Sequence, residues 1–224
     1  VIPTKVDSSG NTQDLVKIVR KDSIGCLSYA KSGQNSKWGN NTLYTLLNEY
    51  YYGQKNVESN YTQNGCFVCA RDSVFDPYEC HNSICNYKNI GISSDENDYY
   101  GKMIKEVYWN SGVNTISSTS QANITGFSKE ASATTSGKIG LLTASDYGIV
   151  GCSNWIYMSS GQLTMTQAKA NGTTISGACY DDTDSDSTRD AVDAGLVHPV
   201  VYLDPSVYVI SGDGTEANPY QLGM

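Results

Sequence analysis

Short apolar runs bounded by polar, glycine-containing turns predict strands at several places along the chain. An apolar run at 139–142 lies near the start of the stretch 137–157, in which a turn at 145–148 precedes Cys152 and Trp155. We interpret this stretch as two buried strands around a turn, with Cys152 and Trp155 at the centre of the core.

Two other segments place apolar residues at helical spacing. The first predicted helix covers 38–52, and its buried face is made of Leu43, Leu46, Leu47 and Tyr50. The second covers 94–109 and starts with polar and acidic residues that suit a helix N-terminus. Its predicted buried stripe consists of Tyr99, Met103, Ile104, Val107 and Tyr108.

The two ends of the chain predict further strands. Residues 1–19 read as an extended hairpin with a turn at 8–11, and 24–29 as another short strand. Near the C-terminus, the segments 198–203 and 207–210 predict strands of the core. A tight turn at 211–215 and an edge strand at 218–222 follow them.

The composition narrows the classes of partner. The chain of 224 residues has a net charge of -8, which argues against nucleic acid because phosphates need a basic surface. Charged residues make up only 17%, and polarity comes from Ser, Thr, Asn, Gly and 17 Tyr. This amino-acid composition is typical of secreted bacterial surface proteins and of adaptable binding loops. No apolar run is long enough to predict a membrane span.

Seven cysteines favour an oxidising compartment, so we expect a secreted or cell-surface location. Cys66, Cys69, Cys80 and Cys85 lie in a loop-rich segment, where they either hold zinc or form two disulfides. The extracellular setting favours disulfides, with the connectivity open. We expect Cys152 to form a disulfide with Cys179 across the core. Cys26 is then the candidate for the seventh, unpaired cysteine.

An acidic segment at 182–193 is a candidate calcium loop. Its carboxylates fall at loop positions 1, 3, 5, 9 and 12, a spacing that points alternate oxygens at one centre. They belong to Asp182, Asp184, Asp186, Asp190 and Asp193. The sixth position is Ser187 instead of the usual Gly, and a solvated acidic loop is the alternative interpretation. Calcium is therefore the cofactor that we expect.

Several short motifs resemble a group of extracellular domains from gut bacteria. The matching pieces run from about residue 38 to 222, in the same order as in those domains. They are Trp38 with Thr42 and Leu43, Met103 and Ile104 with Trp109, the segment 137–148 with Trp155, and Pro199 with 212–215 and 218–220. These domains resemble the C-type-lectin-like fold of formylglycine-generating-enzyme-type and retroelement-variable proteins.

The resemblance implies an α+β fold, with two helices around a small twisted, mostly antiparallel sheet and long loops that present a ligand surface. It implies a single domain over 1–224, in which 1–36 forms an N-terminal strand or hairpin segment. Two positions depart from the pattern: His198 stands where the family tends to have Arg, and 168–195 is unusually acidic.

We therefore predict a non-catalytic extracellular binding domain, an adhesin or pilus-borne subunit, that recognises a glycan or a surface protein through loops at 113–136 and 159–195. A structural subunit of a surface filament is one alternative, in which neighbouring copies would be the partners. A cell-wall cysteine peptidase of the NlpC/P60 type is another, because Cys152 and His198 have the residue types of a thiolate and its base. The motif around Cys152 departs from that family at Gly151.

Overall fold

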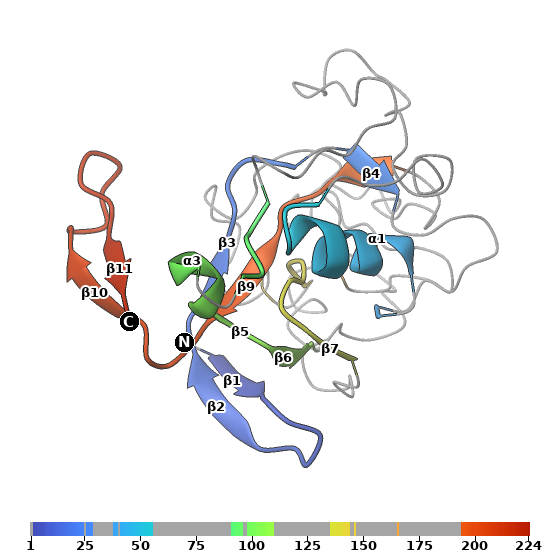
Figure 1. Cartoon of the computed structure of the whole chain (residues 1–224), viewed down its shortest axis with the longest axis horizontal. Coiled ribbons are helices and arrows are strands. Elements are labelled where there is room, and N and C mark those ends of the chain that lie inside the picture. Colours follow the sequence, from blue (N-terminus) through green and yellow to red (C-terminus); the bar gives the residue numbers. More distant parts are fainter. Residues whose placement is uncertain are drawn as a thin grey trace, which may run out of the picture.

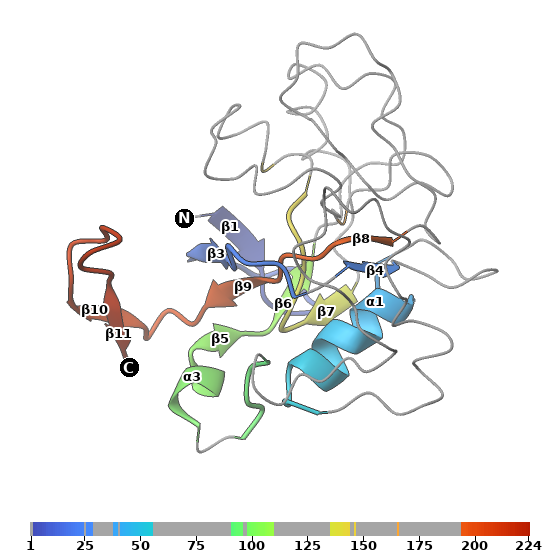
Figure 2. The same ribbon diagram turned by 90° about the horizontal axis from the view of Figure 1, so that it is seen from above.

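The computed structural model describes about half of the chain, and the short elements within it are mostly strands. The described residues are 2–24, 26–28, 38–39, 41–55, 91–95, 98–109, 135–143, 146, 165 and 194–224. Within them, every pair of named strands is antiparallel and about 15% of the residues are helical. Figures 1 and 2 show these elements from two directions.

The N-terminal hairpin has the form that the sequence predicts. β1 (Ile2–Lys5) and β2 (Thr12–Leu15) pair antiparallel around a turn in which Gly10 has a φ of 91°. The Asp7 carboxylate accepts hydrogen bonds from the main-chain and side-chain nitrogens of Asn11, which closes the turn. Short polar side chains that bind their own turn explain why this hairpin can be read from local sequence.

A three-stranded sheet forms the centre of the described fold. β9 (Val200–Leu203) lies between β3 (Lys17–Val19) and β5 (Ile104–Lys105). Gly140 and Val200 exchange two main-chain hydrogen bonds of 2.9 Å, so residue 140 shares one edge of β9 with β5. Figure 1 shows β9 crossing the middle of the molecule between these segments.

Two smaller sheets flank the central one. β4 (Cys26–Ser28) pairs with β8 (Ala194–Leu196), and β6 (Val107–Trp109) pairs with β7 (Thr135–Gly137). β4 falls within the predicted strand at 24–29. The predicted core strand at 139–142 is buried, but among the described residues its ladder contact is the single bridge between Gly140 and Val200. Cys152 and Trp155 lie outside the described residues.

The first predicted helix is present in a shorter form. α1 (Thr42–Thr45) continues as a π-helix, η1 (Leu46–Tyr51), and the Asn41 side chain accepts a 2.8 Å hydrogen bond from the Tyr44 main-chain nitrogen. An Asn at this position satisfies a main-chain donor that the first helical turn leaves unpaired. Gly53 follows the helix with a φ of 126°, a conformation that favours glycine at a helix end.

The prediction of a second helix at 94–109 is wrong over most of this segment. Among the described residues of this segment, only α3 (Tyr99–Lys102) is helical. It is capped by Asp98, whose carboxylate accepts from the nitrogens of Tyr100 and Gly101. The segment then enters β5 and β6, where Val107 and Trp109 are buried and Tyr108 between them is half-buried. Alternating burial of β-branched and aromatic residues is the signature of a strand.

The expected α+β, C-type-lectin-like fold is therefore wrong for this chain. That fold required two long helices around one twisted sheet. The described residues instead form five small antiparallel sheets, with one helical segment at 42–51 and a single helical turn at 99–102. The fold class is better described as small antiparallel sheets around a mixed hydrophobic core.

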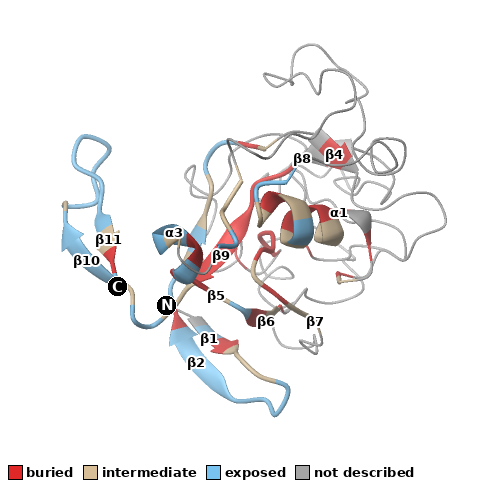
Figure 3. Cartoon of the chain, in the orientation of Figure 1, coloured by how far each residue is buried: buried red, intermediate tan, exposed pale blue. Residues whose placement is uncertain are grey.

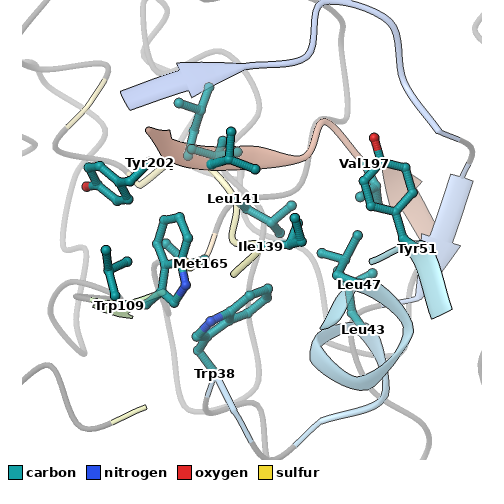
Figure 4. Close-up of a cluster of buried hydrophobic side chains, with 14 of the residues drawn as sticks. Trp38, Leu43, Leu47, Tyr51, Trp109, Ile139, Leu141, Met165, Val197 and Tyr202 are labelled. Carbon is teal, nitrogen blue, oxygen red and sulfur yellow. The ribbon is translucent and has the colours of Figure 1, made fainter. Parts of the chain in front are cut away.

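The core joins the helix to the central sheet, and Figure 4 shows its side chains meeting from both sides. Trp109 and Tyr202 pack with ring centroids 5.1 Å apart, and Gly140 lies directly against the Trp109 ring. The largest fully buried side chains are Leu15, Leu27, Leu43, Leu46, Leu47, Ile139, Leu141 and Met165. Burial on this scale is the main stabilising contribution to such a fold.

Asn48, in the π-helix, connects the helix to the buried segment beside β9. Its Oδ1 accepts hydrogen bonds from the main-chain nitrogens of Lys138 (2.9 Å) and Ile139 (3.0 Å). Its Nδ2 donates to the carbonyl oxygens of Ile139 (2.9 Å) and Tyr44 (3.2 Å). One side chain therefore satisfies the main-chain groups of a segment that lacks a continuous ladder partner.

We predict that Asn48→Ala lowers the free energy of unfolding by about 2–4 kcal/mol, because it leaves these main-chain groups without partners. Glu49→Ala is the matched control, since Glu49 is exposed on the same helix. Chemical denaturation of both variants measures the difference. Equal losses in the two variants would contradict the role given to Asn48.

Candidate interaction surface

The residues that the sequence singled out as a site lie outside the described part of the chain. These are the five candidate calcium ligands, Asp182, Asp184, Asp186, Asp190 and Asp193, and the six cysteines expected in disulfides, Cys66, Cys69, Cys80, Cys85, Cys152 and Cys179. Most of the predicted ligand loops, 113–136 and 159–195, lie there too. Within the described residues, no group of three or more His, Cys, Asp or Glu side chains is placed to hold a metal ion.

The C-terminal hairpin provides a candidate surface that the sequence did not indicate. β10 (Tyr208–Ser211) and β11 (Gln221–Gly223) pair as a separate two-stranded sheet, at the positions where strands were predicted. All four residues of β10 are exposed, however, and Figure 3 shows the hairpin standing away from the buried part of the fold. The sequence analysis placed this strand in the core, so its exposure is a correction.

The C-terminal end of this hairpin is joined to α3, and exposed aromatic or aliphatic side chains lie on both elements. The Met224 main-chain nitrogen donates a 3.1 Å hydrogen bond to the Tyr99 hydroxyl, which ties the end of β11 to α3. The rings of Tyr99 and Tyr100 are 5.9 Å apart in an edge-to-face arrangement, and Tyr100 is 71% exposed.

Two side chains of β10 extend the same surface. A methyl group added at Gly223 would lie 3.1 Å from the Tyr208 ring and 2.7 Å from Ile210, so both side chains cover that glycine. We call this group the tyrosine surface. It consists of Tyr99, Tyr100, Tyr208, Ile210 and Met224, all of them exposed.

The tip of the hairpin is held by its own polar groups. The Asp213 carboxylate accepts from the main-chain nitrogen and the hydroxyl of Thr215, and these hydrogen bonds lower the pKa of Asp213. Gly212 and Gly214 both have positive φ values, 93° and 81°, that favour glycine. The hairpin is therefore a shaped projection with a defined turn.

A second group of exposed apolar side chains lies on β3 and the residue before it. Val16 is 44% exposed and Ile18 is 41% exposed, and among the described strands β3 pairs only with β9. The large exposed apolar side chains of the described residues thus fall on two elements of structure. One is the α3–hairpin region, and the other is the outer edge of the central sheet.

His198, the candidate base of the peptidase hypothesis, is buried just before β9. It is 3% exposed, and its Nδ1 lies 3.3 Å from the Arg20 carbonyl oxygen. Because a carbonyl oxygen only accepts, Nδ1 carries the hydrogen of this contact. Burial lowers the pKa of His198 despite the opposing effect of its hydrogen bonds to main-chain carbonyls. Its expected partner Cys152 lies outside the described residues.

The buried imidazole predicts a pH dependence of stability. Its folded pKa lies below the ordinary value of 6.5, so the unfolded chain binds the extra proton first as the pH falls. Stability should therefore decrease between about pH 7 and 5, by up to about 1.4 kcal/mol per pH unit. His198→Gln should flatten this slope in denaturation curves. His81→Gln, which removes the other histidine, should leave it unchanged, and the reverse pattern would refute the assignment.

Lys17 and Asp146 form an ion pair at the edge of the core. Lys17 Nζ lies 2.6 Å from Asp146 Oδ2, and both side chains are about one-tenth exposed. The same carboxylate oxygen accepts from the main-chain nitrogen and the hydroxyl of Thr143. Burial by itself would lower the pKa of Lys17, but the Asp146 carboxylate and Tyr202 outweigh it, and the net shift raises this pKa. The pair links β3 to the segment after residue 142.

We predict that Asp146→Ala costs about 3–5 kcal/mol of folding free energy, because it leaves a buried ammonium group unpaired. Lys17→Met should cost less, since Asp146 keeps its two hydrogen bonds from Thr143 and the methionine fills the space. Urea denaturation of both variants measures this order. A larger loss for Lys17→Met would contradict it.

Comparisons with known proteins do not indicate a function for this chain. Searches of family models, curated proteins and solved structures find no match to the chain. Among the described helices, none has the length and apolar character that crossing a membrane requires. Any functional assignment therefore rests on the composition of the chain and on the geometry described above.

Proposed function

We propose that the chain is an extracellular, non-catalytic ligand-binding domain, an adhesin or pilus-borne binding subunit, secreted or held at a cell surface. The observation that carries this proposal is the tyrosine surface. Soluble proteins usually bury large apolar side chains, and a group of them exposed on neighbouring elements is typical of an interaction site. The cysteine content and the low fraction of charged residues support the extracellular setting.

The chemistry of the tyrosine surface suits a neutral glycan or a protein partner. Each tyrosine offers a flat apolar ring and a hydroxyl group while losing little conformational freedom on binding. The segment 204–224 carries three carboxylates, Asp204, Asp213 and Glu216, and no Lys or Arg. Asp204 is paired with Lys105, and the remaining carboxylates, Asp213 and Glu216, lie at the hairpin tip, where they disfavour an anionic ligand such as nucleic acid or an acidic glycan.

A structural subunit of a surface filament is the second candidate function. The exposed β10 strand and the exposed Ile18 of β3, which pairs only with β9 among the described strands, favour it, because open strand edges readily pair with another chain. The two roles are compatible, since a pilus-borne subunit both assembles and binds.

We predict that Tyr100→Ala and Tyr208→Ala each weaken ligand binding about tenfold or more, the loss expected when a well-packed interface aromatic is removed. Arrays of neutral glycans, sialylated glycans and purified extracellular-matrix proteins serve as probes of the wild-type chain and both variants. Thr12→Ala, an exposed change on β2, is the control. Absence of binding to every probe, or undiminished binding by a Tyr100→Ala, Tyr208→Ala double variant, would overturn the proposal.

A further inference from the structure

Two lysines of the central sheet, Lys17 and Lys105, each form an ion pair with an aspartate. Both lie opposite Tyr202 in the strand register, on the two strands that pair with β9. Lys17 Nζ lies 2.6 Å from Asp146 Oδ2, and Lys105 Nζ lies 3.2 Å from Asp204 Oδ2. The side chains of the first pair are 10% and 9% exposed, against 32% and 25% for the second. The first pair therefore holds its two charges where little water reaches them.

The surroundings of the Lys17–Asp146 pair fix both groups in one arrangement. Asp146 Oδ2 also accepts from the main-chain nitrogen (2.6 Å) and the hydroxyl (2.9 Å) of Thr143. On the lysine side, Nζ lies 5.6 Å from the centre of the Tyr202 ring. Removing an ammonium and a carboxylate group from water carries a desolvation penalty that can exceed their mutual attraction. A neutral bond between the two groups keeps the contact and removes both charges.

The same arrangement favours a reaction between the two groups. Well-oriented groups within one molecule reach effective concentrations on the order of 10⁵–10⁸ M. A lysine becomes a nucleophile once its amine loses the extra proton, and desolvation promotes that loss. Burial by itself lowers the pKa of Lys17, and the Asp146 carboxylate is the largest of the effects that raise it. Transfer of the proton to Asp146 cancels that charge, so the two groups become neutral together.

We propose that Lys17 and Asp146 condense to an amide bond between their side chains, a covalent cross-link that joins β3 to the segment after residue 142. One proton passes from Nζ to Oδ2 along the hydrogen bond, and the nitrogen lone pair attacks Cγ. A second hydrogen moves from Nζ to Oδ2, the Cγ–Oδ2 bond breaks, and Oδ2 leaves as water. Oδ1 becomes the amide oxygen. No group is oxidised or reduced, and the step needs no co-reactant.

Thr143 assists this step, because its main-chain nitrogen and its hydroxyl both donate to the oxygen that leaves. Donors placed in advance at this oxygen stabilise the charge that develops on it as its bond to carbon breaks. The exposed Lys105–Asp204 pair lacks this protection from water, so its two groups stay ionised and solvated. The condensation is therefore selective for the buried pair.

The cross-link closes a covalent loop between two residues that are 129 positions apart in the sequence. A closed loop restricts the unfolded chain, as a disulfide does, but an amide is not broken by reducing agents. The bond also fastens β3, and with it the N-terminal end of the chain, to the core. It is independent of the tyrosine surface, so it stands or falls separately from the proposed binding role.

The experiment is mass spectrometry of the intact chain after reduction and unfolding in denaturant. The wild-type mass should be lower than the mass of the sequence by one water molecule. Trypsin does not cleave after an acylated lysine, so the digest should contain the peptide 6–20 joined to the peptide 139–169. Cleavage after Lys105, in the exposed ion pair, should be normal.

Lys17→Arg is the matched variant, because it keeps the positive charge while its guanidinium group does not form this amide. Its mass should equal that of its sequence, whereas Lys105→Arg should keep the loss of one water. A wild-type mass equal to that of the full sequence would show an ion pair only and overturn the proposal. A loss of water that persists in Lys17→Arg would also overturn it, since the reaction would then lie elsewhere in the chain.

Discussion

Strand β9 needs hydrogen bonds along both of its edges, and the rest of the described core is arranged by that requirement. β3 occupies one edge, and β5 and Gly140 share the other. A side chain at residue 140 would collide with the Trp109 ring, so glycine is what allows this segment to lie between β9 and the aromatic core. The Asn48 side chain accepts hydrogen bonds from Lys138 and Ile139, the two residues before Gly140. The helix, the buried segment and the sheet are therefore connected by hydrogen bonds.

The parts of the fold that could be predicted from the sequence are those that short-range chemistry determines. Both terminal hairpins carry their own turn signals, and the helix at 42–51 has a capping Asn41 and a following glycine. The segment 99–109 could not be assigned in this way. Its apolar residues fit a helical period, yet Val107 and Trp109 also fit a strand, and the choice depends on β7 and β9, which lie far along the chain.

The candidate surface was missed for a different physical reason. A short run such as β10 looks the same in sequence whether it is buried between two strands or exposed at an edge. What decides its exposure is the absence of a packing partner among the described residues, and that is a property of the fold. One signal was nevertheless present: 204–224 contains no Lys or Arg and places its apolar strand beside a glycine-rich turn, a composition that leaves the strand few ways to be covered within its own segment.

The charges of the two exposed edges support a functional interpretation of both. Natural proteins commonly place charged side chains on edge strands to prevent pairing with other chains. β10 has no charged residue, and the one charged side chain of β3, Lys17, is turned onto Asp146 and neutralised there. Arg20, just after β3, donates from its guanidinium to the Tyr51 hydroxyl in the core. Among the described residues, neither β10 nor β3 therefore carries a free charged side chain within the strand, although the chain as a whole is acidic.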